Sequence, residues 1–350
     1  MQYPDVRFSG AVLGFLVALP ALAAPPDEVA GLTWCSGSKE CVSWSSVAGA
    51  TQYLVYKGDA ATLPALATTG LDSCSAGAFT ATTTGDLLIR RPGPGELLWY
   101  LVTARNADGE GSAGTGTNTP RLPNANGKCC GELAFRERFN AANGAPWPPP
   151  WQRVCSVDRS DVQNGSGRYR PVLSGYSLAR LTAPIDERDV EVRLSMQFED
   201  SETQGIGFYV RQNGGCLQNT PLHGAGYAVF VEDFRTDGIG VWRERDGNEE
   251  SISINFNPSF DFQNGVRYRV RFRCLQESPV TTRLQAKFWI EGSAEPAGWQ
   301  VDAVDGLPSL QGVSGGLAAD SWSNYTWPGP PGGIAHTFID DVEIERVCPP

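Results

Sequence analysis

The stretch VRYRVRFRC, residues 266–274, decides the fold of the second half of this chain. An arginine occupies every second position, and Tyr, Val or Phe stands between the arginines. Because successive side chains of a β-strand point to opposite faces, this period of two predicts a strand with one apolar and one cationic face. The cations are Arg267, Arg269, Arg271 and Arg273. They form either an ion-paired sheet surface or a row that binds an anion.

Other segments of the second half alternate in the same way. Residues 189–198 (DVEVRLSMQF) place apolar side chains on one face and polar side chains on the other. Hairpin logic pairs residues 266–274 with 283–292 (RLQAKFWIEG), which turns Trp289 outward beside the arginines. Residues 335–347 (AHTFIDDVEIERV) are expected to form the closing strand. The pattern predicts stacked antiparallel sheets.

The composition indicates the same fold class. The 350 residues include 40 glycines and 25 prolines, and 10% of them are aromatic. Abundant turn formers between short alternating segments are typical of all-β proteins, and the length suffices for two domains. The net charge of −11 argues against nucleic acid as a partner, because phosphate binders normally carry an excess of Lys and Arg.

The N-terminus predicts export. Residues 11–23 (AVLGFLVALPALA) form an apolar core that ends in small residues at the spacing of a cleavage site, so residues 1–23 are expected to be a signal peptide. This run is too short to span a bilayer, and no later stretch reaches eighteen apolar residues. The expected location is therefore secreted or at the cell surface, without a transmembrane segment.

The cysteines agree with an oxidising compartment. All nine follow residue 23, there is no Cys-x-x-Cys spacing, and only two histidines exist, which favours disulfides over zinc. We expect Cys35 to pair with Cys41. One of the adjacent cysteines Cys129 and Cys130 is expected to bridge back to Cys74, and the other forward to Cys348. An odd count leaves one thiol free or paired between chains.

Residues 28–122 form a first unit. The segments VSWSSVAGATQYLVYKG (42–58) and WYLVTARNADGEGSAG (99–114) resemble a fibronectin type III domain of bacterial exported proteins. The resemblance implies an immunoglobulin-like sandwich, with Trp44 as its core tryptophan and Tyr100 on its penultimate strand. Such domains are usually spacers or adhesive modules. Residues 123–131 are a linker rich in Pro, Asn and Gly.

Residues 132–348 form a second unit. The succession of RFNAANGAPWPPPWQ, GYAVFVEDF, GVRYRVRFRC, AKFWIEGSAEPAGWQV and FIDDVEIERV resembles the concanavalin A-like (laminin G-like) jelly-roll domains of bacterial secreted proteins. The resemblance implies two stacked antiparallel sheets. It implies little about activity, because that superfamily holds lectin-like binders, adhesive modules and glycoside hydrolases.

Catalytic carboxylates are poorly supported. Laminarinase-type enzymes of this fold carry Glu-x-Asp-x-(x)-Glu on one strand, and ERDGNE imitates it with Glu244, Asp246 and Glu249. Asp-Gly-Asn is a strong turn signal, however, and would move Glu249 to the return strand. In DVEIE, Asp341 replaces the first Glu, and the strand is expected to be terminal. No catalytic residue is assigned.

Sugar binding is better supported, because sugars stack on exposed aromatic rings and bind planar polar groups. One candidate surface is the outward face of the 266–291 hairpin, with Trp289, Arg267, Arg269, Arg271 and Lys287, which would suit an acidic polysaccharide. The competing interpretation is an ordinary ion-paired surface. The second candidate is the loop 320–333, with Trp322, Tyr325 and Trp327; it is equally typical of a lid over the sandwich edge.

The sequence thus predicts a secreted, non-catalytic protein that binds extracellular polysaccharide, cell-surface glycan or matrix. A glycoside hydrolase or polysaccharide lyase of the same fold is the first alternative, and a purely structural surface protein the second. No cofactor and no metal ligand are assigned. A structural calcium ion, with Asp340 or Asp341 contributing, is compatible with a jelly roll.

Overall fold

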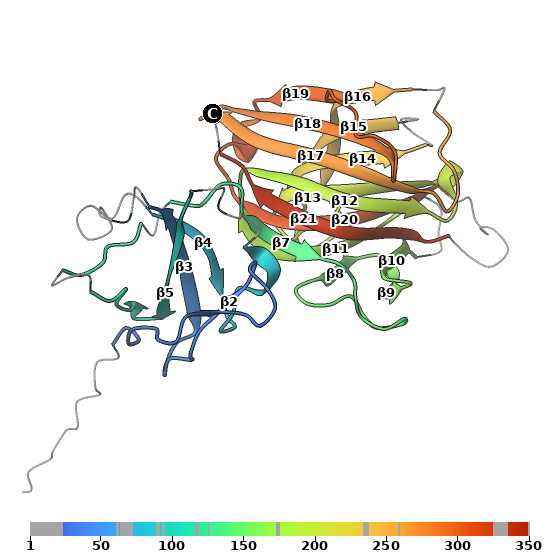
Figure 1. Cartoon of the computed structure of the whole chain (residues 1–350). Coiled ribbons are helices and arrows are strands. Elements are labelled where there is room, and N and C mark those ends of the chain that lie inside the picture. Colours follow the sequence, from blue (N-terminus) through green and yellow to red (C-terminus); the bar gives the residue numbers. More distant parts are fainter. Residues whose placement is uncertain are drawn as a thin grey trace, which may run out of the picture.

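The computed structural model describes residues 24–348, except 61–62, 64–72, 89–91, 93–94, 116–118, 125–126, 173–175, 234–237, 258–259 and 325–334. The expected signal peptide lies outside the described residues. The described chain forms two β-rich units, a smaller one at the N-terminal side and a larger two-layered one (Figure 1). No described helix is long and apolar enough to cross a membrane.

The first unit contains a two-stranded and a four-stranded sheet. In the small sheet β1 (Thr33–Trp34) pairs with β2 (Val42–Ser43). The larger sheet has the order β4-β3-β5-β6, with the bounds Cys74–Phe79, Gln52–Asp59, Leu98–Asn106 and Gly109–Glu110. Trp44 is buried between the sheets and packs edge-on against Tyr53 at 5.4 Å between ring centroids. The expectation that Trp44 belongs to a core is confirmed.

The second unit is a sandwich of two antiparallel sheets. One has eight strands in the order β19-β18-β17-β12-β21-β10-β9, with β7 also paired to β21. Its strands are β7 (Leu133–Glu137), β9 (Val157–Gln163), β10 (Ser166–Pro171), β12 (Val190–Phe198), β17 (Arg267–Ser278), β18 (Thr281–Ile290), β19 (Val301–Asp305) and β21 (Thr337–Arg346).

The other sheet has seven strands in the order β16-β15-β14-β13-β20-β11-β8. Its strands are β8 (Gln152–Cys155), β11 (Tyr176–Glu187), β13 (Gln204–Gln212), β14 (Gly226–Glu232), β15 (Gly238–Arg245), β16 (Asn248–Phe256) and β20 (Gly315–Asn324). Three one-turn 3-10 helices complete the described elements: η2 (Gly85–Leu87), η3 (Ser201–Thr203) and η4 (Pro308–Leu310).

The main hydrophobic core lies between the two sheets. The apolar residues of β12 and β17 point into it, including Val192, Leu194, Val270 and Phe272. The strand β17 pairs with β18 in the register Val270↔Phe288, so the outward neighbours are Arg269↔Trp289 and Arg271↔Lys287. The alternation read in the sequence therefore holds. Trp147 and Trp151 of the Pro-rich segment also belong to this core.

Two expectations about strand placement were wrong. The strand β21 was expected at the edge because it is the last in the chain. It lies inside its sheet, where it pairs with β12 on one side and β10 on the other. Trp322 lies on β20 and not in a loop. Its side chain is buried on the outer face of the seven-stranded sheet. Tyr325 and Trp327 lie outside the described residues.

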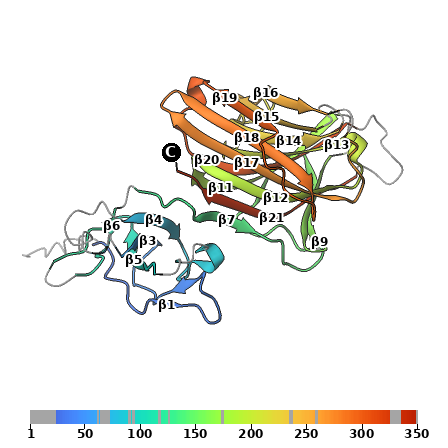
Figure 2. The ribbon, with the colours of Figure 1, turned by 45° about the horizontal axis from the view of Figure 1, so that its top comes forward.

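The two units are joined by covalent and ionic contacts around the linker. Cys129 pairs with Cys74 of β4, and Cys130 pairs with Cys348 after β21, as the cysteine pattern led us to expect. The buried side chains of Lys57 and Glu132 form an ion pair between the units. Arg346 bonds Glu187 and, at 2.7 Å, the carbonyl of Ala76. Figure 2 shows the linker and β7 running along this joint.

The remaining cysteines are also accounted for. Cys35 pairs with Cys41, as expected. Cys155 at the end of β8 pairs with Cys216 in the β13–β14 connection, which the sequence did not indicate. Cys274 is the free thiol; it is buried in the sandwich core on β17. Burial raises the pKa of this thiol to about 12, so it stays protonated and unreactive.

Candidate functional site

The arginine row (Arg267, Arg269, Arg271 and Arg273) lies on the outer face of the eight-stranded sheet and is ion-paired throughout. Arg267 contacts Asp340 at 2.6 Å and Glu291 at 3.3 Å. Arg269 contacts Asp341 at 3.2 Å and Glu291 at 3.6 Å. Arg271 and Arg273 share the carboxylate of Glu191. The row is therefore a charge lattice spread over β12, β17, β18 and β21.

Glu191 on β12 is the centre of this lattice. Its carboxylate accepts hydrogen bonds from Arg271 at 2.7 Å and from Arg273 at 2.7 Å, and also pairs with Arg193 at 2.6 Å. Burial alone would raise the pKa of Glu191, but the hydrogen bonds from Arg271 and Arg273 outweigh it and hold the pKa below its ordinary value. The carboxylate is therefore ionised at neutral pH, and it engages three arginines.

Trp299, in the β18–β19 connection, covers this part of the lattice. Its ring centroid lies 5.3 Å from the guanidinium carbons of Arg271 and Arg273, and 5.0 Å from Lys287 Nζ. These cations are neighbours on one sheet face, so they approach the ring from one side. Cation–π attraction holds an indole in place over such groups. Trp299 is half-buried, so part of its side chain stays accessible to solvent.

The backbone beside Trp299 is fixed to β18. The Gln300 amide bonds both the N–H and the carbonyl of Phe288, at 2.8 and 3.1 Å. Glu295 pairs with Lys287 at 2.7 Å and with Arg271 at 2.8 Å. These contacts fold the connection back onto the sheet and hold the indole in one orientation.

Trp289 lies on the same outer face, on β18. It is half-buried, and its Cα partner on β17 is Arg269. Two positions separate it from Lys287, which places the two side chains on one face about 7 Å apart along the strand. Trp289 and Trp299 thus flank Lys287. We call this region, with its surrounding ion pairs, the tryptophan surface.

The opposite face of the sandwich holds a second cluster, of which the sequence indicated only the two glutamates. Arg180 on β11 is fully buried and forms a bidentate pair with Asp320 on β20, at 2.7 and 2.6 Å. It also donates to Glu244 at 2.7 Å and lies 4.0 Å from Glu249. Its guanidinium carbon stands 4.5 Å from the Tyr209 ring centroid. We call this group the Arg180 cluster.

The glutamates of the Arg180 cluster come from one hairpin. Glu244 on β15 and Glu249 on β16 are Cα partners across the Asp246-Gly247 turn, so Glu249 lies on the return strand, as the turn signal predicted. Asp246 at the turn points to solvent. Burial raises the pKa of Glu244 to about 7, against the opposing effect of Arg180.

The Arg180 cluster is covered by the connection between β13 and β14. Gly215 in that connection accepts a hydrogen bond from Arg180 at 3.0 Å, and Cys216 packs on the same face as Tyr209. A Cβ on Gly224 would lie 2.2 Å from Glu244 Oε1, so only glycine permits this close approach. The Glu244 side chain is 0% exposed and that of Glu249 10%, which leaves no path for a polymer.

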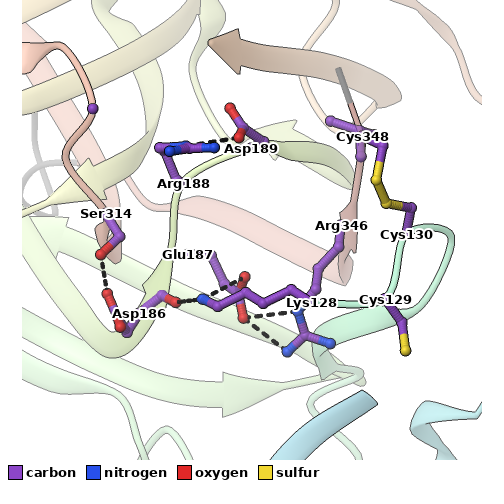
Figure 3. A pocket seen from close by; sticks show the side chains of 12 residues that line it. Lys128, Cys129, Cys130, Asp186, Glu187, Arg188, Asp189, Ser314, Arg346 and Cys348 are labelled. Atoms are coloured by element: carbon purple, nitrogen blue, oxygen red, sulfur yellow. Dashed lines mark hydrogen bonds and ion pairs between the residues drawn. A yellow bond between two sulfur atoms is a disulfide. The ribbon is translucent and has the colours of Figure 1, made fainter. Parts of the chain in front are cut away.

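A pocket of about 410 Å³ lies at the joint between the units (Figure 3). Lys128 extends from the linker to the carbonyl of Asp186, at 2.5 Å, and to the Glu187 carboxylate. Arg188 and Asp189 pair with each other on the other wall. The described lining residues include no aromatic ring. The pocket is therefore part of the joint and lacks a surface on which a sugar could stack.

The carboxylates named for calcium are engaged elsewhere. Asp340 bonds Arg267 and accepts the Asp341 backbone N–H at 2.7 Å, while Asp341 contacts Arg269. In the described part of the chain, no group of three or more His, Cys, Asp or Glu side chains is placed to hold a metal ion.

The candidate residues that the structure describes lie on two different sheets. Trp289, Lys287 and the arginine row share the outer face of the eight-stranded sheet, whereas Trp322 lies on the seven-stranded sheet. Trp299 was missed, although it stands in a Gly- and Pro-containing connection directly after the hairpin, where an exposed aromatic is a usable signal. Arg180 and Asp320 carry no such signal, because they lie 140 residues apart in sequence.

Comparisons with known proteins were made for the whole chain. No protein-family model and no curated protein matches it. Similar solved structures include the carbohydrate-binding module CBM66 from Bacillus subtilis, with 13% identity and a TM-score of 0.39 over 56% of this chain and 94% of that one. The alginate lyase Aly36B in complex with alginate tetrasaccharide has 15% identity and a TM-score of 0.43 over 62% and 98%. The β-glucanase of Bacillus licheniformis has 11% identity and a TM-score of 0.36 over 61% and 97%. The fold follows from the strand order of the two sheets.

Proposed function

We propose that the protein is an exported, non-catalytic carbohydrate-binding protein whose tryptophan surface holds the ligand. The observation that carries this proposal is Trp299, whose ring centroid lies within 5.3 Å of three cations while its side chain stays partly exposed. An aromatic ring that is fixed before binding stacks on the C–H face of a sugar with little loss of conformational entropy. Trp289 offers a second ring on the same face.

Glycan-array binding by the full chain tests the proposal. Trp289→Ala and Trp299→Ala are each expected to weaken binding at least about tenfold, because interface tryptophans commonly contribute this much. Trp34→Ala is the matched control, since Trp34 is a half-exposed tryptophan of the first unit, far from the tryptophan surface. Equal binding by all three variants would contradict the proposal, and silence across the array would favour a purely structural surface protein.

The domain identities are part of the proposal. The order β4-β3-β5-β6 and a second small sheet around Trp44 support an immunoglobulin-like, fibronectin type III-like spacer. Two large antiparallel sheets with a common core support a concanavalin A-like jelly roll. Four disulfides among the described cysteines support export through residues 1–23.

Hydrolysis or elimination of a polysaccharide is the second candidate function. The observation that favours it is the meeting of Glu244, Glu249 and Asp320 around Arg180, with the pKa of Glu244 raised to about 7. Perturbed carboxylates of this kind are often catalytic. Burial of the cluster under the β13–β14 connection favours binding over catalysis. Polysaccharide turnover that Glu244→Gln abolishes would reverse this preference.

A further inference from the structure

We infer that the tryptophan surface takes uncharged sugars, and not the acidic polysaccharide that its arginines at first suggest. This inference rests on the proposed function and specifies its ligand class. It follows from what the arginines already contact, from the charge balance of the face, and from the groups left exposed beside the indoles.

Arg271 and Arg273, the arginines beside Trp299, already direct their guanidinium groups at carboxylates. Arg271 donates Nε and Nη2 to the two oxygens of Glu191, at 2.7 and 2.9 Å, and Nη1 to Glu295 at 2.8 Å. Arg273 donates Nε and Nη2 to Glu191, at 3.0 and 2.7 Å. A uronate or sulfate would have to displace these carboxylates, and the Glu191 side chain, 3% exposed, would be left buried without its partners.

The part of the face around the tryptophans is not cationic. The ion pairs that involve the arginine row, Arg193, Arg283 and Lys287 contain seven cations and eight carboxylates, which gives a formal charge of −1. The cations are Arg193, Arg267, Arg269, Arg271, Arg273, Arg283 and Lys287, and the carboxylates are Glu191, Glu277, Glu291, Glu295, Asp302, Asp340, Asp341 and Glu345. The chain as a whole carries −11, so no long-range field attracts an anion either.

Exposed hydrogen-bond acceptors lie beside the indoles, together with partly exposed arginines that are already paired. The side chains of Glu291 and Glu295, which contact the arginine row and Lys287, are 36% and 38% exposed, and that of Asp341 is 47% exposed. A carboxylate oxygen that already pairs with a guanidinium keeps lone pairs that can accept from a sugar hydroxyl. The same oxygens repel a carboxylate or sulfate. Rings for stacking and acceptors for hydroxyls together describe a neutral pyranose site.

Calorimetric titration of the full chain tests the ligand class. The probes are cellohexaose, xylohexaose and mannohexaose as neutral ligands, and hexagalacturonate and a heparin-derived hexasaccharide as anions, each at 50 and 500 mM NaCl. We expect at least one neutral probe to bind with an affinity that changes less than about twofold with salt, because no ligand charge is screened. The anions are expected to bind at least about tenfold more weakly.

A charge variant sharpens the test. Glu295→Gln removes the carboxylate that Arg271 and Lys287 share beside Trp299, and should raise hexagalacturonate affinity. Glu277→Gln is the matched control, because Glu277 pairs with Arg283, which lies farther along β18 from Trp289. Tighter, salt-sensitive binding of an anion that Trp299→Ala abolishes would overturn the inference while supporting sugar binding. Absence of binding by every probe would contradict the proposed function itself.

Discussion

Glu244 is a carboxylic acid whose acidity is changed strongly by its surroundings. It is buried beside Arg180, and one of its oxygens, Oε1, has no hydrogen-bond partner. Asp320 and Glu249 add negative charge to the same cluster, so one guanidinium faces three carboxylates. Burial and this excess of acid raise the pKa of Glu244 to about 7. The cluster therefore binds a proton near neutral pH.

The raised pKa of Glu244 makes the free energy of unfolding depend on pH. The folded protein keeps a proton on Glu244 that the unfolded chain releases near pH 4.5, so stability falls as pH rises from about 4.5 to about 7. Glu244→Gln imitates the protonated form. We expect the variant to match the wild type near pH 4.5 and to exceed it above pH 7 by up to about 3 kcal/mol.

Urea unfolding from pH 4.5 to 8 measures this difference. Asp246→Asn, which removes a solvent-exposed carboxylate from the adjacent turn, controls for the loss of charge alone. Parallel stability curves for Glu244→Gln and the wild type would contradict the account of the cluster.

Residue roles were predictable from the sequence only where contacts are local. The alternation in residues 266–274 located the outward arginines and Trp289 correctly, because a strand turns side chains by a fixed rule. The carboxylates that neutralise the arginines come from β12, β21 and the β18–β19 connection, and only the sheet order brings them together. Arg180 and Asp320 meet for the same reason.

Among the elements, the β15–β16 hairpin shows how closely turn chemistry fixes the fold. Asp246 and Gly247 both have positive φ, 52° and 72°, as a two-residue turn of type I′ requires. Gly247 also faces the β13–β14 connection, where a Cβ would lie 2.5 Å from the Gln218 nitrogen. The turn therefore supports the segment that covers the Arg180 cluster.

Two glycine variants separate strain from crowding. Gly265 has nearly the same φ, 74°, but nothing lies within 4 Å of its added Cβ. Gly265→Ala is expected to cost about 1 kcal/mol of unfolding free energy, from the left-handed backbone alone. Gly247→Ala should cost clearly more, at least about 2 kcal/mol, because backbone atoms must also move. Equal losses in chemical denaturation would show that the β13–β14 connection does not press on the turn.

Element types were largely predictable, and element order was not. Alternation and turn residues identified β12, β15, β17, β18 and β21, since both signals act within a few residues. The position of β21 in the middle of its sheet depends on pairing with β12 and β10, more than a hundred residues earlier. Trp322 was misplaced because a Trp-rich segment beside Pro and Gly looks like a loop, whereas β20 continues to Asn324.

At the scale of the whole molecule, covalent and ionic contacts link the two units at the joint. Adjacent cysteines bind the linker to both units, and the buried pair of Lys57 and Glu132 crosses between them. The pairing of these cysteines was predictable in outline from their spacing. The ion pair was not, because neither residue carries a signal of burial in the sequence.

A double-mutant cycle tests the joint. Lys57→Met leaves the Glu132 carboxylate buried without its cation and is expected to cost about 3–5 kcal/mol of stability. Lys57→Met combined with Glu132→Leu replaces the pair by apolar groups and should recover most of that loss. Additive losses in the double variant, measured by denaturant unfolding, would show that the two side chains do not depend on each other.

The central claim is that sugar binds on the tryptophan surface and not on the opposite sheet. The direct measurement is the indole N–H spectrum of ¹⁵N-labelled protein during titration with cellohexaose, xylohexaose or mannohexaose, with Trp→Phe variants to assign the signals. We predict saturable shifts of the Trp289 and Trp299 signals, with those of Trp242 and Trp322, near the Arg180 cluster, unchanged. Shifts of Trp242 and Trp322 with Trp289 and Trp299 unmoved would contradict the account.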